Sequence, residues 1–164
     1  MIKILLLALL GHGATDVDSA KLKRAEAHLQ ELLLGKAIVK EAERHLGEPY
    51  VWGGIDGLKD GGLDCSGFTS TVLRSFGIPA PYSAMDQFRG GIGIERPALA
   101  PGDLVFFLGS PMHVGIYAGN GEMIHAPGKG KTVSRASFNK SYFATRYAGA
   151  RRYRPTPKKK ESKP

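Results

Sequence analysis

The chain has 164 residues, which is enough for one domain with a buried core. Hydrophobic residues make up 42% of the chain and charged residues 23%, a balance that argues against a disordered or fibrous protein. The net charge of +8 is concentrated at one end, because residues 151–164 hold seven Lys or Arg side chains against one Glu. We therefore predict a solvated basic tail over residues 155–164. Such a tail would touch anionic surfaces and indicates no specific nucleic-acid site.

The first 17 residues have the pattern of a short leader. Lys3 precedes an apolar run over residues 4–10, and small residues follow, as in a minimal export signal. The run is too short to cross a bilayer as a helix. The pattern therefore predicts either a secreted, periplasmic or cell-wall protein, or a short apolar segment that remains part of the chain.

Helix signals fill the first half of the chain, and strand signals fill the second. An apolar stripe predicts an N-terminal helix over residues 18–35 that stops at Gly35, and a second helix follows over residues 36–46. A third helix begins at Cys65 and ends before Gly77. The segments "PGDLVFFL", "HVGIYAGNGEMIHA", "TVSRA" and "YAGARRYR" then read as strands, the second of them as a hairpin. This order predicts an α+β fold with an antiparallel sheet, and a main domain over residues 36–154.

Cys65 is the only cysteine, so the chain cannot form an internal disulfide. Its place in "GGLDCSGF", at the start of a helix, exposes the thiol to unpaired amides and to the positive end of the helix dipole. Both favour the thiolate and predict a lowered pKa, so the location suits a nucleophile. Asp64 opposes that shift with its own charge. We expect Asp64 and Ser66 to hold the turn or to face a substrate.

A cysteine nucleophile needs a base, and the chain has five histidines. His28 and His45 fall on amphipathic helices, and His12 lies in the leader. The remaining two, His113 and His125, lie on opposite strands of the predicted hairpin, where their imidazoles can meet. His113 would then serve as the base, and His125 would orient it. Two other interpretations stay open: Cys65 as a small buried hydrophobic residue, and the three side chains as zinc ligands.

Five segments, in order and at characteristic spacing, resemble the NlpC-type cell-wall cysteine peptidases. They are "LGEPYVWGG", "DCSGF", "PGDLVFF", "HVGIYAGNGEMIHAP" and "YAGARRYR". The resemblance covers residues 36–154 and implies a compact papain-like fold. It implies that Cys65 is the nucleophile, His113 the general base and His125 the residue that orients the base.

The resemblance also implies a substrate and a set of supporting residues. Tyr50 would contribute to the oxyanion region, and Asp64 and Ser66 would border the peptide end of the substrate. Members of this family cleave peptidoglycan stem peptides, often between γ-D-glutamate and a diamino acid such as meso-diaminopimelate, and need no metal or cofactor. The sulfur of Cys65 is expected about 3 to 4 Å from a ring nitrogen of His113.

Two alternatives accompany this functional hypothesis. One is an amidase or transacylase built on the same scaffold. The other is a structural, wall-penetrating component of a phage tail or secretion device, with a virion or secretion-machine partner. The small size of the chain suits the second alternative, whereas the presence of Cys65, His113 and His125 together favours an enzyme.

Overall fold

The computed structural model describes residues 16–155 of the chain. The leader predicted over residues 1–17 and the tail predicted over residues 155–164 therefore lie outside the described residues, except at their inner ends. Two compact units divide the chain, residues 1–33 and residues 34–164. The described part of the first unit is helical. Within the described range, no helix combines the length and the apolar character that crossing a membrane requires.

Helix α2 runs from Asp16 to Glu43 without interruption. The helix boundary predicted at Gly35 is therefore wrong. A Cβ atom at position 35 would lie 2.0 Å from the carbonyl oxygen of Pro101. Glycine stands here because the helix backbone approaches the turn before β2 at very short range, and Ile38 and Ala42 continue from this point into the core.

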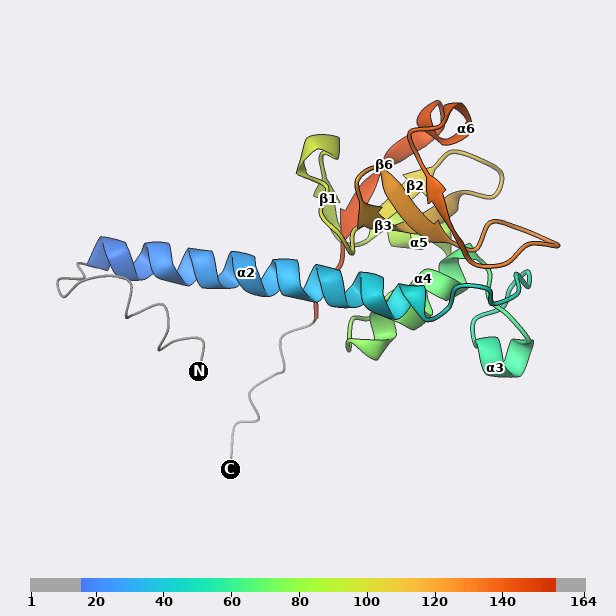
Figure 1. Ribbon diagram of the computed structural model, residues 1–164, viewed down its shortest axis with the longest axis horizontal. Helices are drawn as coiled ribbons and strands as arrows, with labels where there is room; N and C mark the ends of the chain where they lie inside the picture. Colours follow the sequence, from blue (N-terminus) through green and yellow to red (C-terminus); the bar gives the residue numbers. More distant parts are fainter. Residues whose placement is uncertain (1–15, 156–164) are drawn as a thin grey trace. The chain divides into compact units, whose positions relative to one another are not determined.

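One six-stranded antiparallel sheet forms the centre of the second unit (Figure 1). Its strand order is β1-β6-β2-β3-β4-β5, so the last strand of the chain inserts between β1 and β2. The predicted hairpin is confirmed, with Asn120 and Gly121 between its strands. The bounds are β1 Ile92–Ile94, β2 Leu104–Phe107, β3 His113–Gly119, β4 Glu122–His125, β5 Ser134–Ser137 and β6 Tyr147–Arg152.

The helix predicted to start at the cysteine is also confirmed, as α4 (Cys65–Ser75). The loop expected after it contains a further helix, α5 (Ala84–Arg89), whose N-cap Ser83 accepts a hydrogen bond from the amide of Asp86 at 3.4 Å. A serine followed three residues later by an acidic residue is a helix-start signal, so this helix was available from the sequence. The remaining short helices are α3 (Gly57–Asp60), the 3-10 helix η1 (Arg96–Ala98) and α6 (Ser141–Ala144).

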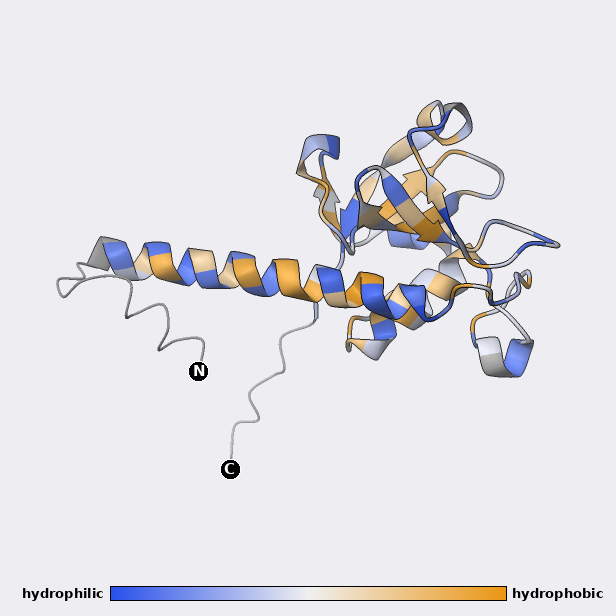
Figure 2. Cartoon of the chain, viewed as in Figure 1, coloured by the Kyte–Doolittle hydropathy of each residue, from blue (hydrophilic) through white to orange (hydrophobic). Residues whose placement is uncertain are grey.

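Two hydrophobic clusters fill the domain. The larger one joins α4 and the end of α2 to the sheet, and it includes Phe68, Val72, Val114 and Ile116. The smaller one is centred on Phe107 and also contains residues of β4 and β6. Figure 2 shows hydrophobic residues gathered on the central strands. The mixed α+β architecture expected from the sequence is therefore the one observed.

Gly35→Ala tests the close approach of α2 to Pro101. In an open helix this change stabilises a protein by about 1 kcal/mol. Here the new methyl group meets a backbone carbonyl, and forced overpacking costs about 1 to 3 kcal/mol or more. We expect a net loss in the free energy of unfolding, measured in urea. Lys36→Ala, at the exposed neighbouring position, should change it by about 0.5 kcal/mol or less. Stabilisation by Gly35→Ala would contradict this account.

Candidate active site

The carboxylate of Asp64 shapes the turn that presents Cys65. Its Oδ1 accepts hydrogen bonds from the amide of Gly67 at 2.7 Å and from the hydroxyl of Ser66 at 3.0 Å. Its Oδ2 accepts the amide of Gly53 at 3.1 Å, which ties the glycine-rich loop to the first turn of α4. Asp64 is therefore the N-cap of α4 and fixes where the helix, and the thiol on it, begins.

The two hairpin histidines meet as predicted. Nε2 of His113, at the start of β3, lies 2.7 Å from Nδ1 of His125, at the end of β4. The ring centroids are 5.0 Å apart, and the ring of Phe143 contacts both imidazoles. The antiparallel register between β3 and β4 brings the two side chains together although 11 residues separate them in the chain.

Gly115 makes room for this pair. It lies between His113 and Tyr117 on β3, and a Cβ atom there would stand 3.1 Å from the Cβ of His125 and 3.0 Å from the sulfur of Met123. A larger residue would push His125 away from its partner. The glycine in "HVGIY" is therefore part of the site although it carries no side chain.

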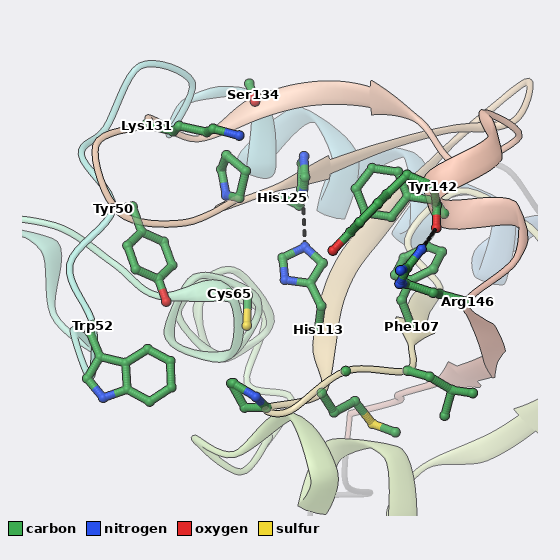
Figure 3. A pocket seen from close by; sticks show the side chains of 16 residues that line it. Tyr50, Trp52, Cys65, Phe107, His113, His125, Lys131, Ser134, Tyr142 and Arg146 are labelled. Atoms are coloured by element: carbon green, nitrogen blue, oxygen red, sulfur yellow. Dashed lines mark hydrogen bonds between the residues drawn. The ribbon is translucent and has the colours of Figure 1, made fainter.

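Cys65 faces the histidine pair across the site (Figure 3). Its side chain is buried, and the second ring nitrogen of His113, Nδ1, is directed toward it. Within the described residues, Cys65 forms no hydrogen bond to either histidine. The separation of about 3 to 4 Å between sulfur and nitrogen thus stays a prediction. Tyr50 extends its hydroxyl toward the start of α4 from the other side of the sulfur.

Burial dominates the electrostatics of the three side chains. It raises the pKa of Cys65 to about 11, and the charge of Asp64 adds to the rise, whereas the backbone amides of Val114 and Ser66 oppose it. Burial lowers the pKa of His113 to about 4 and that of His125 to about 3. The expectation of a lowered cysteine pKa is therefore wrong, because the loss of solvent around the thiol outweighs the effect of the helix amides.

Tyr50 shares this environment. Its pKa is raised by burial, and electrostatic interactions with Cys65 and Asp64 act in the same direction. The phenol therefore keeps its proton at neutral pH and remains a hydrogen-bond donor.

Two cavities flank the sulfur. The larger, of about 630 Å³, has the histidines and Tyr50 in its wall, together with Lys131, Tyr142 and Arg146. The smaller, of about 240 Å³, has Asp64, Ser66 and Tyr82 in its wall. All six site residues predicted from the sequence therefore line one cavity or the other.

The sequence reasoning missed Lys131, Tyr142 and Arg146. They lie on segments that carry no recognisable motif, in the β4–β5 connection and in the segment from α6 to β6. The fold of the whole sheet brings these segments into the wall of the same cavity as Cys65, and no local sequence pattern encodes that arrangement.

The sequence also left open a zinc site formed by Cys65, His113 and His125. In the described part of the chain, no group of three or more His, Cys, Asp or Glu side chains is arranged to hold a metal ion. His113 and His125 direct ring nitrogens at each other rather than toward a shared point.

The fold and the site together define a class. A cysteine at the start of a helix, packed against an antiparallel sheet that carries a histidine pair, is the arrangement of papain-like proteins with a cysteine–histidine site. Residues 47–152 match the model of the NlpC/P60 family. The chain belongs to this family, as the resemblance had indicated.

Several known proteins are similar to this chain over most of its length. The chain is 40% identical to a gamma-D-glutamyl-L-lysine dipeptidyl-peptidase of Bacillus cereus, over 72% of this chain and 36% of the relative. It is 35% identical to the murein DD-endopeptidase MepH of Escherichia coli, over 84% of this chain and 49% of the relative. The solved NlpC/p60 domain of the peptidoglycan hydrolase SagA superposes on this chain with a TM-score of 0.61 and 40% sequence identity. The match covers 72% of this chain and 97% of the SagA domain. The chain thus spans well under two thirds of the curated relatives' length.

The raised pKa of Cys65 has a measurable consequence. A thiol with a pKa of about 11 is protonated at pH 7, so alkylation by iodoacetamide should accelerate about tenfold per pH unit from pH 7 to 10. Glutathione, an ordinary thiol, should level off near pH 9 under the same conditions. A rate that is already constant between pH 6 and 8 would show a resting thiolate and contradict the prediction.

Proposed function

We propose that the protein is a cysteine endopeptidase that cleaves peptidoglycan stem peptides. One observation carries the proposal: Cys65 faces Nδ1 of a histidine whose Nε2 is hydrogen-bonded to a second histidine at 2.7 Å. Nucleophile, base and orienting residue are the three parts that acyl transfer by a thiol requires.

The hydrogen bond between the histidines selects a tautomer. When Nε2 of His113 carries the proton and donates it to Nδ1 of His125, Nδ1 of His113 has a free lone pair. With lowered pKa values both imidazoles are neutral at pH 7, so His113 is available as a base. His125 fixes the orientation of the base and is the third member of the site.

Attack on the substrate then transfers one proton and forms one bond. The thiol proton of Cys65 moves to Nδ1 of His113 as the sulfur bonds to the carbonyl carbon. The amide of Cys65 and the hydroxyl of Tyr50 would stabilise the developing oxyanion. Because the resting thiol is neutral, this proton transfer accompanies binding or attack rather than preceding it.

Collapse of the tetrahedral intermediate breaks the carbon–nitrogen bond. The imidazolium of His113 gives its proton to the leaving amine, and a thioester with Cys65 remains. Water attacks the thioester with His113 again as base, which releases the acid and restores the thiol. Asp64 and Ser66 would border the acyl part of the substrate, since they line the smaller cavity, whose wall includes Cys65 but neither histidine.

The relatives supply the substrate class. Their names include a gamma-D-glutamyl-L-lysine dipeptidyl-peptidase and a murein DD-endopeptidase. We infer a cut at a γ-D-glutamyl–diamino acid bond, and action at the cell wall, whether from a secreted or periplasmic protein or from a virion.

Defined muropeptides, with products measured by mass spectrometry, test the proposal. We expect a new cut after γ-D-glutamate. Cys65→Ala should lower the rate by on the order of 10⁴-fold or more, and His125→Ala by about 10² to 10⁴. His28→Ala, which removes an exposed imidazole from α2, is the matched control and should keep the wild-type rate.

The products separate this function from its alternatives. Loss of the whole stem from muramic acid would mean an amidase. Binding without cleavage would mean a structural wall protein. Cleavage that survives Cys65→Ala would refute the assigned nucleophile.

A further inference from the structure

Gln87, on α5, is a fully buried amide that has no role in the proposed proton transfers. Glutamine usually lies at the protein surface, because a buried amide must find hydrogen-bond partners inside the protein. Gln87 also lines neither of the two cavities that flank Cys65. The partners of its amide therefore indicate what its burial achieves.

The partners of the Gln87 side chain belong to two short stretches of the chain. Its Nε2 donates to the carbonyl of Ser66 at 3.0 Å and to the hydroxyl of Ser70 at 2.9 Å, both on α4. Its Oε1 accepts a hydrogen bond from the hydroxyl of Thr69 at 2.8 Å. Nε2 also donates to the carbonyl of Pro81, in the loop between α4 and α5, at 2.7 Å. One side chain thus joins the first turns of α4 to that loop.

Both stretches border the candidate site. Ser66 directly follows Cys65, so its carbonyl belongs to the helical turn that presents the thiol. Tyr82 and Ser83 directly follow Pro81 and lie in the wall of the smaller cavity, which Cys65 also lines. The amide therefore connects the turn that carries the sulfur to a wall of the cavity beside it.

Helix α5 is itself attached to the sheet. The hydroxyl of Tyr153, directly after β6, donates to the backbone carbonyl of Gln87 at 2.9 Å. Nε of Arg151, on β6, donates to the carbonyl of Phe88 at 2.6 Å, and its guanidinium lies 4.2 Å from the centre of the Phe88 ring. The amide of Gln87 thus extends from a helix that is fixed to the last strand of the sheet.

The groups that the amide binds on α4 and in the loop have other partners. The hydroxyl of Thr69 also donates to the carbonyl of Ser66 at 3.1 Å, and the hydroxyl of Ser70 donates to the carbonyl of Pro81. These groups would therefore stay paired without the amide. Its distinct contribution is to fix how the two stretches lie relative to each other, as a fully paired buried network does.

We propose that Gln87 is a positioning residue, which holds the first turn of α4 so that the sulfur of Cys65 stays aligned with His113 and with the smaller cavity. This role rests on the proposed function. Reacting groups must be held within about 0.5 Å of the productive geometry by the hydrogen bonds around them. A sulfur displaced by about 1 Å can lower the rate about a hundredfold.

Gln87→Met, which keeps the length of the side chain and removes its hydrogen bonds, tests the role. We expect kcat for muropeptide cleavage to fall about 10- to 100-fold, with KM changed by about threefold or less, because Gln87 does not touch the substrate. The urea transition should remain cooperative, since the partner groups stay paired. An unchanged kcat would overturn the inference.

Thr69→Val and Thr69→Ser form a matched pair that decides the question even if Gln87→Met does not fold. Valine cannot donate a hydrogen bond to Oε1 of Gln87, whereas serine can. We expect Thr69→Val to lower kcat about fivefold, as for one net hydrogen bond, and Thr69→Ser to keep about half or more of the wild-type value. Equal kcat values for the two variants would contradict the positioning role.

Val39→Ala, in α2, is the control for a loss of stability alone. It removes two methyl groups from the larger hydrophobic cluster and no side-chain hydrogen bond, and Val39 lines neither cavity. Its urea midpoint should fall, while kcat should stay within about twofold of the wild-type value. A loss of kcat in Val39→Ala as large as that in Gln87→Met would mean that stability, and not position, accounts for the effect.

Alkylation of Cys65 by iodoacetamide at pH 8 gives a reading that does not depend on turnover. Cys65 is the only cysteine and is buried, so a released turn should expose its sulfur. Gln87→Met should react about threefold or more faster than the wild-type protein, and Val39→Ala at the wild-type rate. Equal rates for Gln87→Met and wild type would count against the positioning role. Absence of cleavage by the wild-type protein, with faster alkylation of Gln87→Met, would instead count against the proposed function alone.

Discussion

The packing of α4 against β3 is the constraint on which the site depends. Phe68 and Val72 of the helix share one buried cluster with Val114 and Ile116 of the strand. The contact sets the distance and angle between the first turn of the helix and the start of the strand, and so between Cys65 and His113. Nothing local in the sequence joins these two residues, which lie 48 positions apart. The Asp64 cap then fixes the start of the helix within that arrangement.

Burial at this junction explains the electrostatic character of the site. The same packing that brings the thiol and imidazole together removes water from both, and the neutral forms are favoured. A polar cleft remains on either side of the sulfur. Asp64 lines the smaller cavity, and the two histidines line the larger one.

The sequence predicted those parts whose signals are local or carried by motifs. The cysteine helix, the hairpin and the meeting of His113 with His125 follow from residue spacing, and the family resemblance anticipated the fold. Gly35 was misread because a glycine that permits close packing looks the same, in sequence, as one that ends a helix. The pKa of Cys65 was misjudged because the helix terminus is visible in the sequence, whereas the depth of burial is not. Lys131 and Arg146 carry no motif, and their presence in the wall of the same cavity as Cys65 depends on the fold of the whole sheet.

The hairpin that bears both histidines bears on when the three side chains of the candidate site come together during folding. His113 and His125 become neighbours as soon as two adjacent strands pair, an event that involves only a short stretch of chain. The cysteine joins them only when a helix formed much earlier in the chain docks across the sheet. A molecule in which only this hairpin had formed would have the histidine pair without a nucleophile beside it. For the proposed peptidoglycan endopeptidase, hydrolysis would therefore require the complete domain.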